Sequence, residues 1–495
     1  MQLNLSNIEY CYPQAQAPIL RGVTVTFPQG WTGIVGDNGC GKSTLARVAC
    51  GLIAPDVGSV GPTLVSTYCP QDATNPPDNL EDFAAAYDSR AMRLRQTLAL
   101  EDDWSWRYGT LSGGQQKRLQ VACALWSDSD VLVMDEPTNH VDATTRDEIF
   151  HALTGFGGIG ILISHDRALL DSLCSQCLFM GPGVATMRPG GYTQASGQAT
   201  LERESSVRAR EDMRQEKRRI EREAQRRREA AARKEGKKRL RGIDKHDSDA
   251  RHKKRLAIVS GTDGIAARQA SRMEARLGRV SDQLDQMRVE KRYDADIWLE
   301  ATPSRRPVLV RLEPTLLAMG EKRLEVPPLF VGRSDHIGLV GDNGSGKTTL
   351  VRHLVDNMPA GVRVLYIPQE PSEGQQRQAR VALHDLPVEA RGRVLSIVAQ
   401  LNSEPDRILE GDAISPGEMR KLMLALGILD SPELIIMDEP TNHLDLGSVE
   451  ALERVLAAFP GALLLVSHDA ALLEATTSIT WRVVQGDAAN TISCE

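Results

Sequence analysis

The sequence predicts an α/β protein built from two tandem copies of one domain, joined by a long helical-hairpin linker. Three observations predict it: an internal repeat, apolar runs of strand length within each copy, and a charged, proline-free stretch between the copies. At 495 residues the chain exceeds a single hydrophobic core, since single domains rarely pass about 250 residues. We expect the first domain at residues 1–195, the linker at 196–305 and the second domain at 306–495.

The internal repeat consists of five motifs that occur twice, in the same order. The five pairs, with the number of the first residue of each motif in parentheses, are GDNGCGKST and GDNGSGKTT (36, 341), YCPQ and YIPQ (68, 366), LSGGQ and ISPGE (111, 414), VLVMDEPTNHVD and LIIMDEPTNHLD (131, 434), LISHD and LVSHD (162, 465). The offsets all lie between 298 and 305 residues. Constant order at a nearly constant offset indicates that one domain was duplicated.

Each copy also contains short apolar runs, at 32–35, 131–134 and 160–163 in the first copy and at 337–340, 434–437 and 463–466 in the second. Continuous apolar runs of this length fit strands that are buried on both faces. The first run of each copy ends at a glycine-rich turn before a helix-compatible stretch. Each copy is therefore predicted to hold a mostly parallel sheet covered by helices, with an antiparallel β edge.

The stretch between the copies has a different composition. Residues 201–260 carry 22 Lys and Arg against 12 Asp and Glu, a balance of +10 within a chain of net charge −7. Strong helix formers without proline fill residues 201–240, and a second helical pattern runs from about 265 to 292. We expect two long helices joined by a basic tip, with a flexible charged tether as the alternative. A basic arm on an acidic body favours polyanionic partners.

Composition excludes several classes of protein. No apolar run approaches the ~20 residues that cross a bilayer, and the first residues lack the pattern of a secretion signal. Eight scattered cysteines do not suggest a disulfide framework, and the CxxC spacing of Cys174 and Cys177 has no second pair to complete a zinc site. These features predict a cytoplasmic protein.

The two glycine-rich turns match the phosphate-loop pattern GxxxxGK[ST] in the required strand–turn–helix context. Glycines let the backbone curl so that its N–H groups point at a phosphate, next to the positive end of a helix. Lys42 and Lys347 add a charge near the β- and γ-phosphates, and Ser43 and Thr348 offer a hydroxyl to Mg²⁺. The predicted ATP-binding residues are Gly36, Asp37, Asn38, Gly39, Cys40, Gly41, Lys42, Ser43, Thr44, Gly341, Asp342, Asn343, Gly344, Ser345, Gly346, Lys347, Thr348 and Thr349.

Acidic residues follow an apolar strand in each copy. Asp135 and Asp438 end these strands, where a carboxylate can hold a magnesium-bound water. Glu136 and Glu439 come next and can orient or deprotonate an attacking water. An apolar run followed by Asp-Glu is a weak signal alone, but it is a strong one downstream of a phosphate loop.

Two further polar positions repeat. Gln71 and Gln369 are placed to sense the metal or the water. His165 and His468, each after a strand and a serine, are placed to reach a γ-phosphate. Either histidine alone favours a structural role, and their repeated position favours a catalytic one.

This set of motifs resembles the ATP-binding-cassette superfamily in both copies. Twin cassettes, the wording DEPTNHVD and DEPTNHLD, a charged helical linker and no membrane span resemble its ABC-F subfamily. The resemblance implies an ATPase with ATP and Mg²⁺ as cofactors, working as a monomer whose two cassettes pair head to tail. Each ATP would then lie between one phosphate loop and the opposite signature, which pairs Lys42 with Ser415 and Lys347 with Ser112. The implied signature residues are Ser112, Gly113, Gly114, Gln115, Ser415, Gly417 and Glu418, and Tyr12 would stack on adenine.

One signature departs from the family pattern. Pro416 stands where the first signature has Gly113. Proline has no N–H, so a backbone donor is lost and φ is fixed. We therefore expect the Lys42 site to be weaker or slower than the Lys347 site.

The ABC-F resemblance further implies binding in the ribosomal E site, with the linker tip contacting ribosomal RNA and P-site tRNA near the peptidyl-transferase centre. Phosphate neutralisation by basic residues supports RNA contact independently. The candidate contact residues are Lys245, Arg251, Lys253, Lys254 and Arg255. No inserted arm is evident between Gln71 and Ser112, which resembles the branch that protects ribosomes from antibiotics.

Several alternatives remain open. A housekeeping translation factor of the same subfamily is one, and a pair of nucleotide-binding subunits of a transporter is another, although a basic hairpin has no use there. A DNA-repair ATPase would carry its coil inside a cassette. A ribosome-recycling ATPase would begin with a cysteine-rich iron–sulfur domain, whereas the first 30 residues hold only Cys11.

Overall fold

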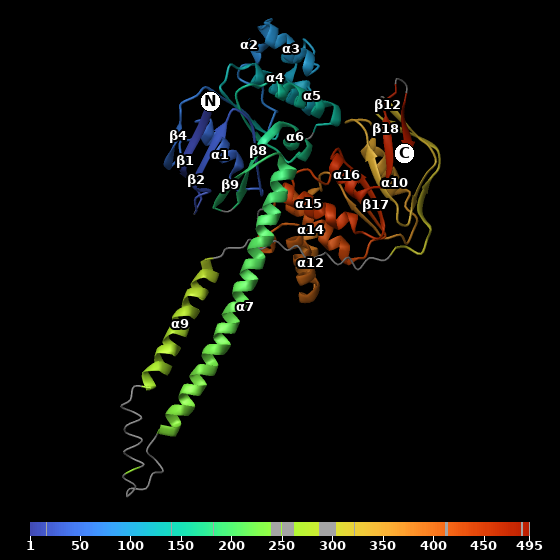
Figure 1. Ribbon diagram of the computed structural model, residues 1–495. Coiled ribbons are helices and arrows are strands. Elements are labelled where there is room, and N and C mark those ends of the chain that lie inside the picture. Colours follow the sequence, from blue (N-terminus) through green and yellow to red (C-terminus); the bar gives the residue numbers. More distant parts are fainter. Residues whose placement is uncertain are drawn as a thin grey trace. The chain divides into compact units, whose positions relative to one another are not determined.

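The computed structural model (Figure 1) describes residues 1–15, 17–139, 141–181, 183–238, 249, 262–286, 303–320, 322–410, 414–486 and 489–494. The chain divides into two compact units. One unit joins Met1–Ala195 with Arg292–Glu495 and holds both copies of the repeat. The other is Ser196–Lys291, a helical unit. Each unit is described separately.

The first copy contains two sheets. The six-stranded sheet has the order β5 (Ser66–Cys69), β6 (Val131–Asp135), β7 (Ile159–Ile163), β3 (Gly30–Gly36), β8 (Cys174–Gly181), β9 (Val184–Pro189). Its first five strands are parallel, and only β9 is antiparallel. A second, antiparallel sheet has the order β2 (Leu20–Pro28), β1 (Gln2–Tyr10), β4 (Val57–Gly61). The predicted parallel sheet with an antiparallel edge is confirmed.

The second copy repeats this plan in one eight-stranded sheet. Its order is β11 (Thr315–Met319), β12 (Lys322–Val326), β19 (Asn490–Cys494), β18 (Ile479–Val484), β14 (His336–Val340), β17 (Ala462–Val466), β16 (Leu434–Asp438), β15 (Val364–Ile367). The strands from β18 to β15 are parallel. A separate hairpin pairs β10 (Val308–Leu312) with β13 (Leu329–Gly332). The carboxyl ends of β14 and β16 therefore meet at one edge, as do those of β3 and β6.

Helices cover these sheets (Figure 1). In the first copy they are α1 (Lys42–Ala49), α2 (Leu80–Ala85), α3 (Ser89–Thr97), η1 (Trp104–Trp106), η2 (Tyr108–Thr110), α4 (Gly113–Trp126), α5 (Ala143–Thr154) and α6 (Arg167–Leu173). In the second they are α10 (Lys347–Asp356), α11 (Glu373–Asp385), α12 (Val388–Gln400), α13 (Pro405–Glu410), α14 (Pro416–Leu429), α15 (Leu446–Ala457) and α16 (Ala470–Thr476). Every residue of β6, β7, β16 and β17 is buried, as expected for strands covered on both faces.

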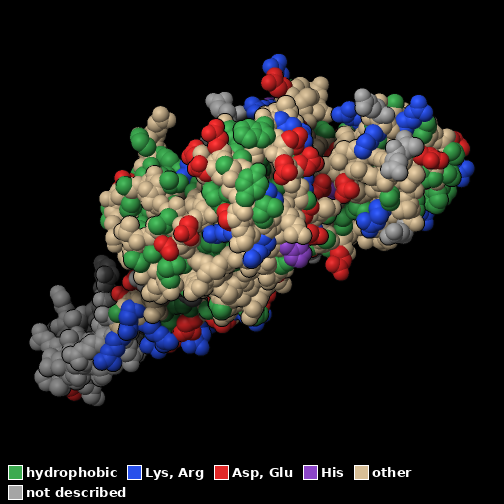
Figure 2. Space-filling model, turned by 90° about the horizontal axis from the view of Figure 1, so that it is seen from above, with side chains coloured by type: hydrophobic (Ala, Val, Ile, Leu, Met, Phe, Trp, Pro, Cys, Tyr) green, Lys and Arg blue, Asp and Glu red, His purple; other side chains and the backbone are tan. Residues whose placement is uncertain are grey.

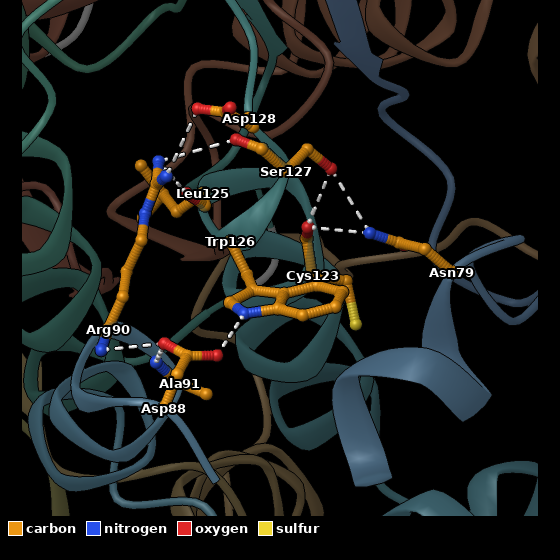
Figure 3. Close-up of polar contacts among 9 residues, drawn as sticks. All are labelled: Asn79, Asp88, Arg90, Ala91, Cys123, Leu125, Trp126, Ser127 and Asp128. Carbon is orange, nitrogen blue, oxygen red and sulfur yellow. Dashed lines mark hydrogen bonds and ion pairs between the residues drawn. The ribbon is translucent and has the colours of Figure 1, made fainter. Parts of the chain in front are cut away.

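Helix α4, which starts at the first signature, is fixed at its other end by polar contacts (Figure 3). Asp88 caps α3 and accepts a hydrogen bond from Trp126 Nε1 at 2.9 Å. Arg90 donates to the Leu125 carbonyl, and Asn79 donates to the Cys123 carbonyl at 3.0 Å. The bond from Arg90 satisfies a carbonyl in the last turn of α4, where helices leave carbonyls without intrahelical partners, and the bond from Asn79 adds to the one that the Ser127 N–H gives to Cys123. They tie α4 to α2 and α3.

All eight cysteines are free thiols, and Cys174 and Cys177 are buried on β8. Within the part of the chain that the structure describes, no helix has the length and apolar character needed to traverse a bilayer. Figure 2 shows acidic and basic side chains interspersed over the face that it presents.

The helical unit contains most of α7 (Tyr192–Lys238) and all of α9 (Thr262–Gln286). Ile220, Ala224 and Met273 bury one another between the two helices. Arg276 of α9 pairs with Glu216 of α7 at 2.7 Å. The two helices of the predicted hairpin therefore lie side by side, while the predicted tip residues Lys245, Arg251, Lys253, Lys254 and Arg255 fall outside the described residues.

Candidate active site

Both phosphate loops adopt the curled backbone that their glycines permit. Gly41 and Gly346 precede α1 and α10 with φ of 100° and 109°, in the left-handed region that glycine adopts without strain. A Cβ on Gly36 would collide with the Met180 carbonyl, so no other residue fits there. Both loops therefore need glycine for conformational and steric reasons.

The two loop lysines fold back over their own loops. Lys42 Nζ donates to the Gly36 carbonyl at 2.7 Å, and Lys347 Nζ donates to the Gly341 carbonyl at 2.6 Å. Each ammonium also reaches the next carbonyl. A positive charge is thus held at the mouth of each ring of backbone N–H groups, which is an arrangement suited to phosphate.

One cavity of about 970 Å³ joins the predicted residues of both copies. Its lining includes Tyr12, Lys42, Ser43, Gln71, Asp135, Glu136, His165, Lys347, Thr348, Gln369, Ser415, Gly417, Asp438, Glu439 and His468. Residues 112–115 of the first signature are not among the described residues that line it. The structure thus brings the Lys42 loop together with the opposite signature, and the pairing of Lys347 with Ser112 stays a prediction.

Each catalytic glutamate candidate lies against its histidine. Glu136 Oε1 is 3.3 Å from His165 Nε2, and Glu439 Oε1 is 3.4 Å from His468 Nε2. Both glutamates have left-handed backbones, with φ of 50° and 47°, which turns their side chains out of the strand direction. The sequence repeat therefore corresponds to a repeated geometry.

Burial sets the protonation of these pairs. It raises the pKa of Glu136 to about 8 and that of Glu439 to about 7. Burial lowers the pKa of His165 to about 3 and that of His468 to about 4, and the neighbouring loop lysines act in the same direction. At neutral pH both histidines are therefore uncharged, and each ring has one nitrogen that donates a hydrogen bond and one that accepts.

The two strand-end aspartates have different partners. Thr348 Oγ1 donates to Asp438 Oδ2 at 3.1 Å. Asp135 Oδ2 instead accepts from the hydroxyl of Tyr68 at 2.6 Å. Tyr68 was missed in the sequence analysis as a functional candidate, although the repeated motif YxPQ contained the signal. Its strand β5 pairs in parallel with β6, which brings it to the carboxylate.

Both signature serines begin their helices in the same way. Ser112 and Ser415 each form a capping box with the third helical residue, Gln115 or Glu418. Pro416 occupies the first helical position, where a missing N–H breaks no helical bond. Glu418 Oε2 accepts from both the backbone N–H and the hydroxyl of Ser415, at 2.9 and 2.8 Å.

Contacts between the copies involve both phosphate loops. Asn38 Nδ2 donates to the His443 carbonyl at 2.9 Å, and the Asn343 backbone N–H donates to Asp142. Tyr12, expected to stack on adenine, hydrogen-bonds Thr44 of its own loop at 3.0 Å. Each phosphate loop thus touches the segment that follows the other copy's glutamate.

Comparisons with known proteins agree with this site. The family model described as ABC transporter matches residues 20–139 and 328–442. Ribosome protection protein VmlR of Bacillus subtilis is 26% identical over 96% of this chain and 85% of its own length. Tylosin resistance ATP-binding protein TlrC of Streptomyces fradiae is 27% identical over 91% of this chain and 92% of its own. The chain is an ABC-F ATPase.

Other relatives and solved structures fit this membership. Energy-dependent translational throttle protein EttA of Mycobacterium tuberculosis is 26% identical over 95% of this ABC-F chain and 89% of its own length. The solved structure of RNase-L Inhibitor matches with a TM-score of 0.63 at 18% identity, covering 98% of this chain and 90% of that one. At that identity the likeness shows the shared fold. The predicted family, tandem cassettes and ATPase activity are confirmed, and each copy of the repeat is an ATP-binding cassette.

Sequence analysis of this ABC-F protein also missed two buried cations. Lys117 Nζ donates to the Gln71 carbonyl at 2.9 Å, and the guanidinium of Arg420 donates to the Gln369 carbonyl. Both lie on the signature helices, α4 and α14, at equivalent positions. Each ties the signature to the glutamine segment of its own cassette. The signal was a basic residue five positions after each signature serine.

Proposed function

We propose that this ABC-F ATPase binds the ribosome in the cytoplasm and modulates translation, with its cassettes closing on ATP and reopening after hydrolysis. The observation that carries the proposal is the single cavity to which both cassettes contribute phosphate loops and glutamate–histidine pairs. Because the cavity is built from both cassettes, a nucleotide bound in it contacts both. The names of the relatives VmlR and EttA refer to ribosome protection and to translation, which supports the ribosome as the partner.

Within this proposal, the phosphate loops hold the ATP phosphates and Tyr12 stacks on adenine. Glu136 and Glu439 orient the attacking water and take up its proton, since a buried carboxylate with a raised pKa suits a general base near neutral pH. His165 and His468 hold these carboxylates and contact the γ-phosphate. The signature of one cassette completes the phosphate site of the other.

The residues of the cavity also fit Mg²⁺. Hydroxyl, carboxylate and amide oxygens converge there, and such hard oxygen ligands are those that Mg²⁺ prefers. The residues that would hold the ion are Ser43, Gln71 and Asp135 in the Lys42 site, and Thr348, Gln369 and Asp438 in the Lys347 site. When bound, the ion neutralises charge that develops on the phosphates.

At the ribosome, we place the protein in the E site, with its linker tip reaching toward the peptidyl-transferase centre. The exposed arginines of α7 in the helical unit support an RNA-facing role: Arg208, Arg214, Arg218, Arg219, Arg222, Arg226 and Arg227. Several of them pair with glutamates one turn away, as Arg227 does with Glu223. The protection of ribosomes from antibiotics at this centre is the specific activity that we propose, as the names of VmlR and TlrC suggest.

The test is sedimentation with ribosomes. The double variant Glu136→Gln, Glu439→Gln should bind ATP, fail to hydrolyse it, and pellet with ribosomes only when ATP is present. A matched control, Lys42→Ala with Lys347→Ala, should not pellet under either condition. Equal pelleting of the double glutamine variant with and without ATP, or turnover at the rate of the unmodified protein, would refute the proposal.

A second experiment tests the linker tip. Replacing Arg251, Lys253, Lys254 and Arg255 with Ala should leave basal ATP hydrolysis nearly unchanged. Each lost phosphate contact should flatten the log–log salt dependence of ribosome binding by roughly 0.7–0.9. Drug protection in cells should be lost as well. An unchanged salt slope would show that the linker acts as a tether.

A further inference from the structure

Arg146 lies at the interface of the cassettes, on α5 of the first cassette, and contacts a loop of the second. Its Nη1 donates to the backbone carbonyl of His468 at 3.2 Å. The ring of that histidine lies 3.1 Å from Lys347 Nζ and 3.4 Å from Glu439. The guanidinium therefore holds the loop that carries the histidine of the Lys347 site from across the interface.

The same guanidinium also faces the histidine loop of its own cassette. Arg146 Nε lies 3.8 Å from Asp166 Oδ2, and Asp166 directly follows His165 and caps α6. Arginine suits this place because its planar fork presents donors in two fixed directions. One side chain thus links the loop of His165 in the Lys42 site to the loop of His468 in the Lys347 site.

The arrangement is one-sided. The repeat offset of 303 residues places Val449 of α15 where the first cassette has Arg146. Val449 is buried in the apolar core of the second cassette and has no donor to offer a carbonyl. The loop of His165 thus receives no such bond from α15, and the two ATP sites differ in how their histidines are held.

A second arginine at the interface provides a contrast. Arg167 of α6 pairs with Glu453 of α15 at 2.8 Å, and both side chains are about four-fifths buried. This ion pair also joins the cassettes, but its partner is the surface of α15 and not the backbone of His468. Adhesion between the cassettes and support of the histidine loop are therefore carried by different arginines.

We propose that Arg146 is a positioning residue that acts across the cassette interface on the Lys347 site, by fixing the loop that carries His468. The inference rests on the proposed roles of Glu439 and His468 in hydrolysis at that site. Nucleotide affinity depends on the phosphate loop and the signature, and the polar contacts of Arg146 go instead to His468 and Asp166. Its loss should therefore lower kcat and leave KM nearly unchanged.

Single-site backgrounds test the proposal. Glu136→Gln leaves the Lys347 site to turn over, and Glu439→Gln leaves the Lys42 site. In the first background, Arg146→Val should lower kcat about tenfold, the effect of losing one charge-assisted hydrogen bond, with less than a roughly threefold change in KM. In the second background kcat should stay within about twofold. Arg146→Lys should retain part of the kcat that Arg146→Val loses, since lysine keeps the positive charge and can still donate a hydrogen bond.

Two control variants and one measurement independent of activity complete the test. Arg93→Val removes an exposed arginine from α3 of the same cassette and should change neither site. Arg167→Ala weakens the interface without touching His468, so it should not lower kcat of the Lys347 site selectively. Hydrogen exchange should become faster around residues 466–470 in Arg146→Val, and by a larger factor than around 163–167, because the bond to the His468 carbonyl is closer than the 3.8 Å pair with Asp166.

The outcomes separate this inference from the function on which it rests. An equal fall of kcat in both backgrounds, the same selective fall in Arg167→Ala, or no change in exchange at the His468 loop would overturn the role of Arg146 alone. Full turnover in the double variant Glu136→Gln, Glu439→Gln would overturn the assignment of the glutamates, and the role of Arg146 with it.

Discussion

Restoring glycine at position 416 should strengthen the Lys42 site. Pro416 lines the cavity beside the Lys42 loop and occupies the first position of α14, where a residue other than proline has an N–H that no helical carbonyl uses. In Pro416→Gly this N–H becomes available to a γ-phosphate oxygen. The change adds a donor at the one point where the two signatures differ in backbone chemistry.

The expected gain in binding free energy is the difference between a new hydrogen bond and the cost of a more flexible loop. A hydrogen bond to a charged acceptor contributes about 1.5–3 kcal/mol. Glycine gives the free loop more conformations to lose on binding, which costs about 1 kcal/mol. The net gain is about 0.5–2 kcal/mol, and it corresponds to a fall in KM at the Lys42 site, or a rise in its turnover, of about 2- to 30-fold. The fold itself should lose about 0.4–1 kcal/mol of stability, because glycine widens the unfolded ensemble.

The assay is steady-state hydrolysis in the Glu439→Gln background, where only the Lys42 site turns over. The mirror variant, Gly113→Pro in the Glu136→Gln background, should weaken the Lys347 site. Its backbone is suited to proline because Ser112 has ψ of 156°, which is compatible with a following proline, and a Cβ at Gly113 meets nothing within 4 Å. If Pro416→Gly leaves KM and kcat of the Lys42 site unchanged, the N–H at this position does not contact phosphate.

Three further predictions concern other parts of the chain. Tyr68→Phe removes the hydrogen bond that orients Asp135, so half-maximal activation of the Lys42 site should need about tenfold more Mg²⁺, read from ATPase titrations in the Glu439→Gln background. Without nucleotide, the pKa of Glu136 is about 8 in the folded protein and near the ordinary value of 4.5 in the unfolded chain. The protonated carboxyl therefore contributes its full stability to the fold below pH 4.5, and this contribution is lost as the pH rises toward 8. Urea titrations between pH 5 and 8 should therefore show the unmodified protein losing up to about 1.4 kcal/mol per pH unit relative to Glu136→Gln, and parallel curves would contradict the burial argument. Ile220→Ala in α7 should lower the free energy that holds α7 against α9 by about 2–4 kcal/mol, and hydrogen exchange should become faster in both helices. Faster exchange in α7 alone would show that the helices do not stabilise each other.

Much of the fold was predictable because the strands and turns of each copy have local sequence signals, namely apolar runs and glycine-rich turns. The apolar run at 131–134 became β6, and the glycine-rich turn after 35 became the loop before α1. The glutamates and histidines were predicted as site residues because each follows an apolar strand and recurs at the same place in both copies, and the structure brings each glutamate within 3.4 Å of its histidine. These features depend on local sequence, and the structure shows each of them in both copies.

Contacts between the cassettes, and side-chain pairs that depend on strand register, were harder to predict. The bond from Arg146 to the His468 carbonyl joins residues 322 apart, and no periodicity in either copy points to it. The pairing of Tyr68 with Asp135 required the register of β5 against β6, which aligns Tyr68 with Val133. A backbone partner such as the His468 carbonyl has no side-chain signature in the sequence, because any residue has a carbonyl.

The contacts of the phosphate loops imply that the two ATP sites are coupled. Asn38 of one loop bonds the carbonyl of His443, which follows Glu439, and Asn343 of the other loop bonds Asp142, which follows Glu136. A phosphate that rearranges either loop therefore alters the segment behind the opposite glutamate. Coupling of binding free energies is reciprocal, so each site must change the other's affinity by the same factor. Rates are not bound by that symmetry. Because Arg146 bonds the backbone of only the His468 loop, and because we expect Pro416 to weaken the Lys42 site, the two hydrolysis rates should differ while the binding energies remain linked.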